Sequence, residues 1–240
     1  MTDSLPAWVF AEFSPVGVDL GSAESVEHYD RNQGTQVAKD DALLDRLPVG
    51  PGTVFVDLGT GTGSLPVRAA FRGAEAHAVD VSENMLAFAE RRAVEAGVGL
   101  TVQHAGFLSH RFERSSVDVV TTRSALHQLP DTWKQLALNR VADMLRPGGV
   151  FYIWDAMWSF AAVELETQLP AWIDEMARPA GEGFTREMFE THVREEFSTF
   201  AWVLEGMLER AGLEVVESDF PAPWYGEFIA RRRSSGQLVV

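Results

Sequence analysis

The sequence contains no cysteine among its 240 residues. It therefore has no disulfide framework, no thiolate metal ligand and no cysteine nucleophile, which suits a reducing compartment. Long apolar runs are missing too: the run that begins at Val150 stops before Asp155, well short of a membrane span. The first ten residues lack the basic start of a signal peptide. We therefore expect a cytoplasmic protein.

Positive charge is also scarce. The chain has 20 Lys and Arg against 35 Asp and Glu, a formal net charge of −15. Because proteins that bind phosphate backbones or anionic lipids concentrate Lys and Arg, we expect neither nucleic acid nor a membrane as a partner. The length suits one sizeable α/β core, and we expect a single domain over residues 1–240.

Glycine is concentrated where an apolar run ends. Residues 52–66 read GTVFVDLGTGTGSLP, in which the acid Asp57 is followed by the alternating glycines Gly59, Gly61 and Gly63. A helical pattern comes next. A strand that leads through a glycine-rich turn into a helix lets a cofactor approach the backbone closely.

The sequence spacing of a second acidic residue is also informative. Asp80 ends the next apolar run, 21 residues after Gly59 (80 − 59), where a carboxylate accepts hydrogen bonds from ribose hydroxyls. A dinucleotide fingerprint requires a third glycine where Ser64 stands, so an NAD-dependent oxidoreductase is the weaker alternative. A cofactor-binding regulatory or partner module without turnover is another alternative.

Three motifs in this order resemble one family. The glycine turn, the run from Ser116 to Pro130 and the turn from Met144 to Val150 are similar to motifs of the class I S-adenosylmethionine-dependent methyltransferases. The resemblance is strong over residues 50–156. It implies S-adenosyl-L-methionine as cofactor, S-adenosyl-L-homocysteine as product and a small-molecule acceptor.

Alternating strand and helix patterns predict a doubly wound α/β fold with a seven-stranded, mostly parallel sheet whose last strand is antiparallel. Residues 1–48 form an N-terminal cap segment in this interpretation, and residues 156–211 form a helical lid inserted before the sixth strand. The predicted strands are Thr53–Asp57, Glu75–Asp80, Gly99–His104, Val117–Thr122, Gly149–Trp154, Leu213–Phe220 and Tyr225–Arg231.

The resemblance also implies a set of cofactor contacts along the carboxyl ends of the strands. The chain departs from the family after the third predicted strand, where the family has an acid that accepts a hydrogen bond from the adenine amino group. Here Ala105, Gly106 and Phe107 offer only backbone groups and an aromatic ring for that contact. The alternative is an acceptor from the loop of Ser109 and His110. The expected cofactor-binding residues are Tyr29, Asp57, Gly59, Thr60, Gly61, Asp80, Val81, Met85, Gly106, Phe107 and Arg123.

Two histidines are candidates for a general base. His127 lies in the loop after the fourth predicted strand, which in this family faces the methyl group and the acceptor. His192 shares a helical face with Glu195 and Glu196, and a neighbouring carboxylate raises the basicity of an imidazole. A histidine bonded to backbone and a solvated helix face are the structural alternatives. No HxH or HxxxH pair occurs, and we expect no metal site.

The composition of the predicted lid bears on the acceptor. From Asp155 to Ala211 twelve carboxylates stand against four arginines, a balance that repels polyanions. The same stretch is rich in Trp and Phe, which line small-molecule pockets as well as hold helices to a sheet. We therefore expect O- or N-methylation of a small, apolar or aromatic, non-polyanionic acceptor.

Overall fold

The computed structural model describes residues 8–14, 26–27, 30–31 and 36–234. Tyr29 lies outside these residues, so the structure gives its predicted role no test. The strands run through the described chain as follows: β1 Val54–Leu58, β2 Glu75–Asp80, β3 Thr101–His104, β4 Val117–Arg123, β5 Leu145–Trp158, β6 Thr199–Phe200, β7 Leu213–Ala222 and β8 Tyr225–Arg232.

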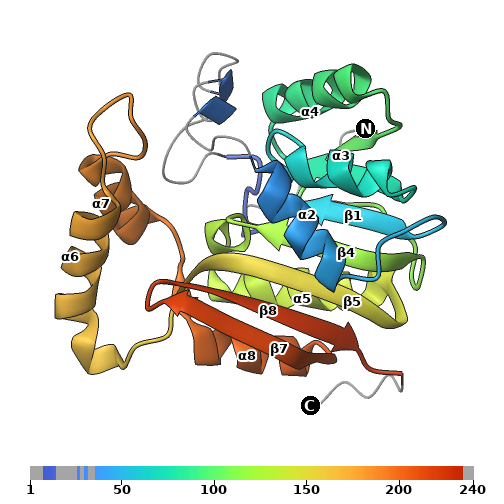
Figure 1. Ribbon diagram of the computed structural model, residues 1–240. Helices are drawn as coiled ribbons and strands as arrows, with labels where there is room; N and C mark the ends of the chain where they lie inside the picture. Colours follow the sequence, from blue (N-terminus) through green and yellow to red (C-terminus); the bar gives the residue numbers. More distant parts are fainter. Residues whose placement is uncertain (1–7, 15–25, 28–29, 32–35, 235–240) are drawn as a thin grey trace.

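The sheet has the predicted topology (Figure 1). Its strand order is β3-β2-β1-β4-β5-β8-β7, with the two-residue β6 paired to β5 off this path. The pairs from β3 to β5 are parallel, whereas β8 is antiparallel to both β5 and β7. Strand order reverses between β1 and β4, which is where ligands bind in open α/β sheets.

Helices cover both faces of the sheet. The helices are α2 Val37–Arg46, α3 Ser64–Phe71, α4 Glu83–Ala96, α5 Asp131–Met144, α6 Leu165–Met176, α7 Arg186–Glu195 and α8 Ala201–Arg210, with short 3-10 turns η1 Leu126–Gln128 and η2 Ala162–Glu164. Neighbouring β1 residues face opposite sides: Phe55 packs in one core with α2 and α3, and Val56 packs in the other with α5 and α8. Burial on both faces explains why parallel strands read as continuous apolar runs.

Strand β5 is longer than the sequence predicts. We expected Gly149–Trp154, whereas the strand starts at Leu145 and runs on to Trp158. Its extension pairs with β8 as far as Ala156 opposite Tyr225. The additional residues continue beyond the carboxyl end of β4 and carry Asp155 to the level of η1, where it meets His127.

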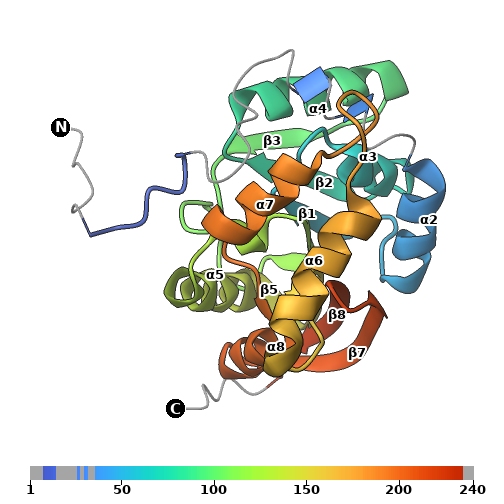
Figure 2. The same ribbon diagram turned by 90° about the vertical axis from the view of Figure 1, so that its left-hand side faces the viewer.

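The predicted lid contains two kinds of helix. Helix α8 buries Ala201, Leu204 and Leu208 in the main core and contacts α5 and β7, as an ordinary crossover helix does. Helices α6 and α7 instead stand at the edge where the parallel strands end (Figures 1 and 2). They have a separate aromatic cluster centred on Trp172 and Phe189, which packs against the β7–β8 connection at Trp224.

No helix in the described parts of the chain is both long and apolar enough to cross a membrane.

Candidate active site

The turn after β1 requires glycine at two positions for different reasons. Gly59 has φ +68°, and a Cβ there would lie 2.3 Å from Cβ of Ala125. Gly61 has φ +54° with no atom near its Cβ position, so only the backbone conformation requires glycine there. The amides of Gly59 and Thr60 donate to the carbonyl of Val79, at 2.8 and 3.0 Å, which fixes the turn against β2.

Asp80 closes this turn from the end of β2. Its Oδ2 accepts the backbone N–H of Gly61 at 2.8 Å, and its Oδ1 accepts the N–H of Ser82 at 2.9 Å. Each carboxylate oxygen keeps a further lone pair. Burial raises the pKa of Asp80, while these backbone bonds act in the opposite direction. Two ordered oxygens with spare acceptor capacity suit a pair of ribose hydroxyls.

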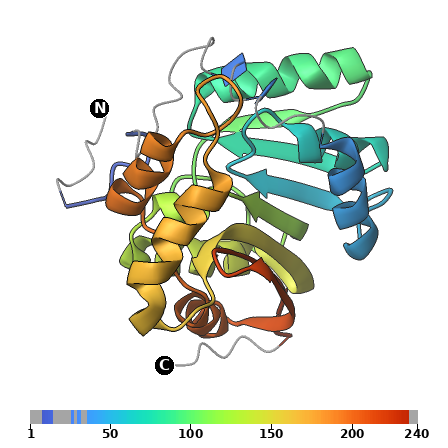
Figure 3. The ribbon, with the colours of Figure 1, turned by 60° about the vertical axis from the view of Figure 1, so that its left-hand side comes forward.

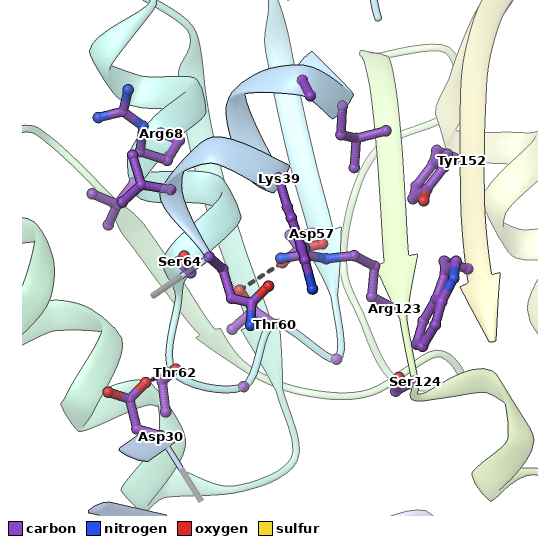
Figure 4. Close-up of a pocket in the computed structure, with 18 of the residues that line it drawn as sticks. Asp30, Lys39, Asp57, Thr60, Thr62, Ser64, Arg68, Arg123, Ser124 and Tyr152 are labelled. Atoms are coloured by element: carbon purple, nitrogen blue, oxygen red, sulfur yellow. Dashed lines mark hydrogen bonds between the residues drawn. The ribbon is translucent and has the colours of Figure 1, made fainter. Parts of the chain in front are cut away.

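Asp57 is deeper, at 3% exposure. Its Oδ1 accepts the hydroxyl of Thr121 at 2.6 Å, and its Oδ2 accepts the hydroxyl of Thr60 at 2.9 Å (Figure 4). Burial raises the pKa of Asp57 to about 6, against the opposing effect of the Arg123 guanidinium. The carboxylate is therefore ionised at neutral pH and takes up a proton in mildly acidic solution.

A cleft of about 1150 Å³ opens beside these residues. Asp57, Gly61 and Arg123 line one part of it, and Tyr152 and Trp154 of β5 line another. Trp154 stacks on Tyr225 with ring centroids 5.0 Å apart, and the Tyr152 hydroxyl donates to Glu227 at 2.7 Å. Typical small-molecule pockets occupy roughly 300–1,000 Å³, so this cleft has space for a cofactor and a second molecule.

Cations line the cleft, but most are paired with carboxylates of the protein. Figure 4 shows Arg123 reaching in from β4 and Lys39 extending from α2 toward Asp57. Arg123 binds the fully buried Asp40 at 2.7 Å, and Arg92 binds Asp30 at 2.8 Å. The other two paired arginines of the lining are Arg46, held by Glu217 and Glu227, and Arg68, held by Asp41.

The loop after β3 receives a carboxylate from the N-terminal segment. Glu12 Oε2 accepts the backbone N–H of Leu108 at 2.9 Å. A Cβ on Gly106 would lie 2.4 Å from that oxygen and 2.9 Å from Cγ1 of Val81, so all three meet at one point. Residues 105–110 of this loop contain no acid, and Glu12 brings a carboxylate to them from 96 residues before Leu108.

Two predicted adenine contacts have structural roles. Phe107 is buried within the main core, and Met85 is buried on α4. Val81, in contrast, is partly exposed beside Gly106. Their contact with a cofactor stays a prediction.

Both candidate histidines belong to one buried cluster. The backbone N–H of His127 donates to Asp155 Oδ2 at 3.1 Å, and His127 Nδ1 contacts Oδ1 of the same carboxylate. On its other side, His127 Nε2 lies 3.0 Å from Glu196 Oε2, which also contacts His192 Nδ1. His192 Nε2 lies 2.8 Å from Ser198 Oγ.

The electrostatics of this cluster bear on the predicted base. Burial disfavours the charged form of His127, but Asp155 and Glu196 outweigh it and raise the pKa of His127 to about 10. Burial acts against ionisation of Glu196 too, and bonds from His127 and His192 lower the pKa of Glu196 to about 2. His127 is then an imidazolium at neutral pH, unable to accept another proton. A role for either histidine as general base stays a prediction.

Local sequence signals exist for only some of the residues that the fold assembles here. The glycine turn and the two acids that follow strands carry local motifs. Tyr152 and Trp154 could have been found as alternating residues on one face of a strand at the sheet's switch point. Glu12 and Asp155 had no local signal, because their partners are distant in sequence.

Comparison with known proteins agrees with this geometry. A family model described as "Methyltransferase domain" matches residues 55–149, which include the glycine turn, Asp80 and His127. The fold is shared with the PH0226 protein of Pyrococcus horikoshii, with a TM-score of 0.67 at 15% identity over 86% of this chain and 94% of that one. Residues 55–149 match a methyltransferase domain, and the sheet has the class I S-adenosylmethionine-dependent methyltransferase fold. The cofactor of this family is S-adenosyl-L-methionine.

Curated relatives match about half of this chain. An uncharacterized methyltransferase of Geobacillus kaustophilus is 30% identical over 126 residues, 52% of this chain and 57% of its own length. A ubiquinone biosynthesis O-methyltransferase of Shewanella is 34% identical over 102 residues, 42% of each chain. The chain thus spans about half of the length of these relatives. Helices α6 and α7 lie beyond the part matched by the family model.

Proposed function

We propose that this protein transfers a methyl group from S-adenosyl-L-methionine to an oxygen or nitrogen of a small apolar or aromatic acceptor. One observation carries the proposal: the turn that Asp80 holds through Gly61 opens on a cleft that continues to Tyr152 and Trp154. A cofactor site and an aromatic wall therefore share one space at the switch point of the sheet.

The residues of the domain fit the cofactor part by part. In this proposal Asp80 accepts from the ribose hydroxyls, and Asp57 attracts the cofactor's ammonium group while Gly59, Thr60 and Gly61 follow its methionine portion. Arg123 lies beside Asp57 and limits the loss of its charge. Val81, Gly106 and Glu12 surround the adenine, with Glu12 in place of the acid that the family has after its third strand. When bound, the cofactor supplies a methyl group on a sulfonium, a good leaving group.

The acceptor half rests on the remaining wall of the cleft. Tyr152 and Trp154 present aromatic surface, and Trp154 is held in place by its stack on Tyr225. Four of the five arginines that line the cleft are engaged by carboxylates of the protein, which compensates most of their positive charge against a polyanion. These features support an uncharged or weakly charged acceptor with a flat apolar surface.

Helices α6 and α7 act as the lid in this proposal. They stand at the carboxyl edge of the sheet (Figure 3), and they pack as a unit through the cluster around Trp172. A lid aligns the acceptor and excludes water from an in-line displacement, the two main tasks of an enzyme whose leaving group is already good. Every residue lining the described cleft lies outside both helices, so the lid governs transfer more than cofactor binding.

Calorimetry with S-adenosyl-L-homocysteine and with NAD tests the cofactor assignment. We expect the first to bind and the second not. Asp80→Ala removes two charge-assisted hydrogen bonds and weakens binding by about 1.5–3 kcal/mol, roughly 10- to 150-fold. Exposed Glu90 on the neighbouring helix α4 provides the control, and Glu90→Ala leaves the affinity unchanged. An unaltered affinity in the Asp80 variant removes that residue from the site.

Transfer itself needs a separate measurement. Incubation with methyl-labelled cofactor and a panel of small phenols, amines and aromatic acids is expected to label at least one class. Tight binding of the cofactor without labelling of any acceptor favours the regulatory or partner module instead. NAD binding in place of S-adenosyl-L-homocysteine points to an oxidoreductase.

A further inference from the structure

We propose that His127, His192 and Glu196 form a binding site for a divalent transition-metal ion, zinc by the chemistry of its ligands, which joins helix α7 to the loop after β4. The site goes beyond methyl transfer, and its existence does not depend on the proposed activity. Its three side chains come from η1, α7 and the residue that caps α7.

The three donor atoms already converge. One ligand atom from each side chain lies within 4.8 Å of the other two. His127 Nε2 is 3.0 Å from Glu196 Oε2, and the same oxygen contacts His192 Nδ1. Tetrahedral zinc bound at about 2.0–2.1 Å separates its ligands by about 3.3 Å. The Gln128 amide also lies 3.1 Å from His127 Nε2, so movement of this amide and of the Glu196 carboxylate opens the position that an ion needs.

The second nitrogen of each imidazole is held in the way metal sites require. His127 Nδ1 contacts Asp155, which directs its Nε2 toward the shared point. His192 Nε2 lies 2.8 Å from Ser198 Oγ, which directs its Nδ1 there. Ligating histidines almost always bond a carboxylate or another polar group through the other nitrogen, and this outer contact fixes the ring. Both rings are therefore oriented with their other nitrogen toward the shared point.

Charge also favours an ion. Asp155 is 3% exposed and the Glu196 side chain 6% exposed, so two carboxylates are buried within one small volume. Among the described residues, the ion pairs of both carboxylates are with these histidines alone. A divalent cation that displaces the proton of His127 balances the two negative charges with both imidazoles neutral, the state in which they act as ligands.

The donor set selects the type of metal. Two imidazoles and one carboxylate suit zinc and its neighbours, whereas calcium and magnesium prefer oxygen ligands throughout. Three protein ligands leave a fourth position for water or another group. The expectation of no metal site rested on the absence of closely spaced histidine pairs in the sequence. Such spacings cannot reveal His127 and His192, which are far apart in the sequence and which the fold brings together.

Metal binding is measured on the full chain after chelator treatment. We expect one zinc per chain by calorimetry and elemental analysis, with a rise in Tm on binding. Cobalt(II) reports geometry, and a tetrahedral site gives intense visible absorption. His192→Ala and Glu196→Gln should abolish the stoichiometric step, and Asp155→Asn should weaken it by about 10- to 100-fold as an outer-contact change. His77 is the matched control, because it also pairs with a glutamate, Glu75, outside the cluster.

Two results overturn the site. One is a wild-type chain, folded by circular dichroism, that binds no stoichiometric zinc or cobalt. The other is a His192→Ala variant that binds as the His77→Ala control does. Either result leaves the cluster as a hydrogen-bonded ionic contact that holds α7 to the core. Neither bears on binding of S-adenosyl-L-homocysteine, so the two proposals fail separately.

Discussion

Glu12 illustrates how one residue changes the interpretation of a binding loop. Its carboxylate meets Gly106 and the Leu108 amide, where the family normally places an acid from the loop itself. We expect Glu12→Ala to weaken S-adenosyl-L-homocysteine binding about tenfold, since one hydrogen bond to a charged acceptor is worth roughly 1.5 kcal/mol. Calorimetry checks this, with exposed Glu27→Ala as control. Tighter binding in the Glu12 variant contradicts the proposal, and it would mean that the segment around Glu12 blocks the cofactor site.

The Asp57 carboxylate is expected to lower stability at neutral pH while it strengthens cofactor binding. Burial raises its pKa from 3.8 to about 6, so the folded state holds the proton more strongly than the unfolded state. The contribution of this group to stability is present below pH 3.8 and is lost as pH rises toward 6. Asp57→Asn keeps the bonds to Thr60 and Thr121, because a hydroxyl both donates and accepts.

The variant should therefore have a higher Tm than wild type at pH 7.5, and the difference should shrink between pH 6 and 4. Cofactor affinity should behave oppositely. Wild-type binding of S-adenosyl-L-homocysteine weakens as pH falls below about 6, whereas Asp57→Asn binds weakly at every pH. Thermal melts and calorimetry across this range provide the check. Parallel pH profiles in the two proteins exclude Asp57 as the group that attracts the ammonium.

At the scale of elements, the sequence predicted the strands well, because a strand that is buried on both faces has a continuous run of apolar residues. It also located the glycine turn and Asp80, whose signals are local. It could not locate the histidine cluster, since no local pattern links His127 with Glu196. It underestimated β5 as well, because Asp155 ends the apolar run while the strand's pairing with β8 continues. Tertiary contacts decide such features, and a single sequence does not display them.

Helix α8 provides a test of where the core ends. Leu208 is fully buried in the main core, whereas Trp202 on the same helix is 70% exposed. Leu208→Ala should cost about 2–5 kcal/mol. For a domain of this size each kcal/mol lowers Tm by roughly 2–4 °C. Trp202→Ala should change stability by about 0.5 kcal/mol or less. Equal, small effects in thermal melts would place α8 with the outer helices instead of the core.

At the scale of the whole molecule, the elements that line the cleft are separate from the outer helices α6 and α7. The sheet and helices α2, α3 and α4 carry residues that line the cleft, together with the turn that Asp80 holds. Helices α6 and α7 have an aromatic core of their own and contribute nothing to that lining. Removing the outer helices therefore separates cofactor binding from transfer.

The structure shows where to cut. Met157 of β5 pairs with Thr199 of β6, so the ends of a deletion between them are already neighbours. We replace Phe160–Phe197 with a short Gly/Ser linker, which keeps both strands and all of α8. We expect S-adenosyl-L-homocysteine to bind as in the full chain, and methyl transfer to be lost because water reaches the cleft and the acceptor is no longer aligned.

Calorimetry, circular dichroism and labelled-methyl transfer on the same preparation distinguish the outcomes. A matched variant that keeps the segment but carries Val163→Ala, at an exposed position before α6, should retain both binding and transfer. If the shortened chain is folded and still transfers methyl groups at the full rate, α6 and α7 are not a lid. The inference of an aromatic acceptor then rests on Tyr152 and Trp154 alone, because the composition of the outer helices no longer bears on what enters the cleft.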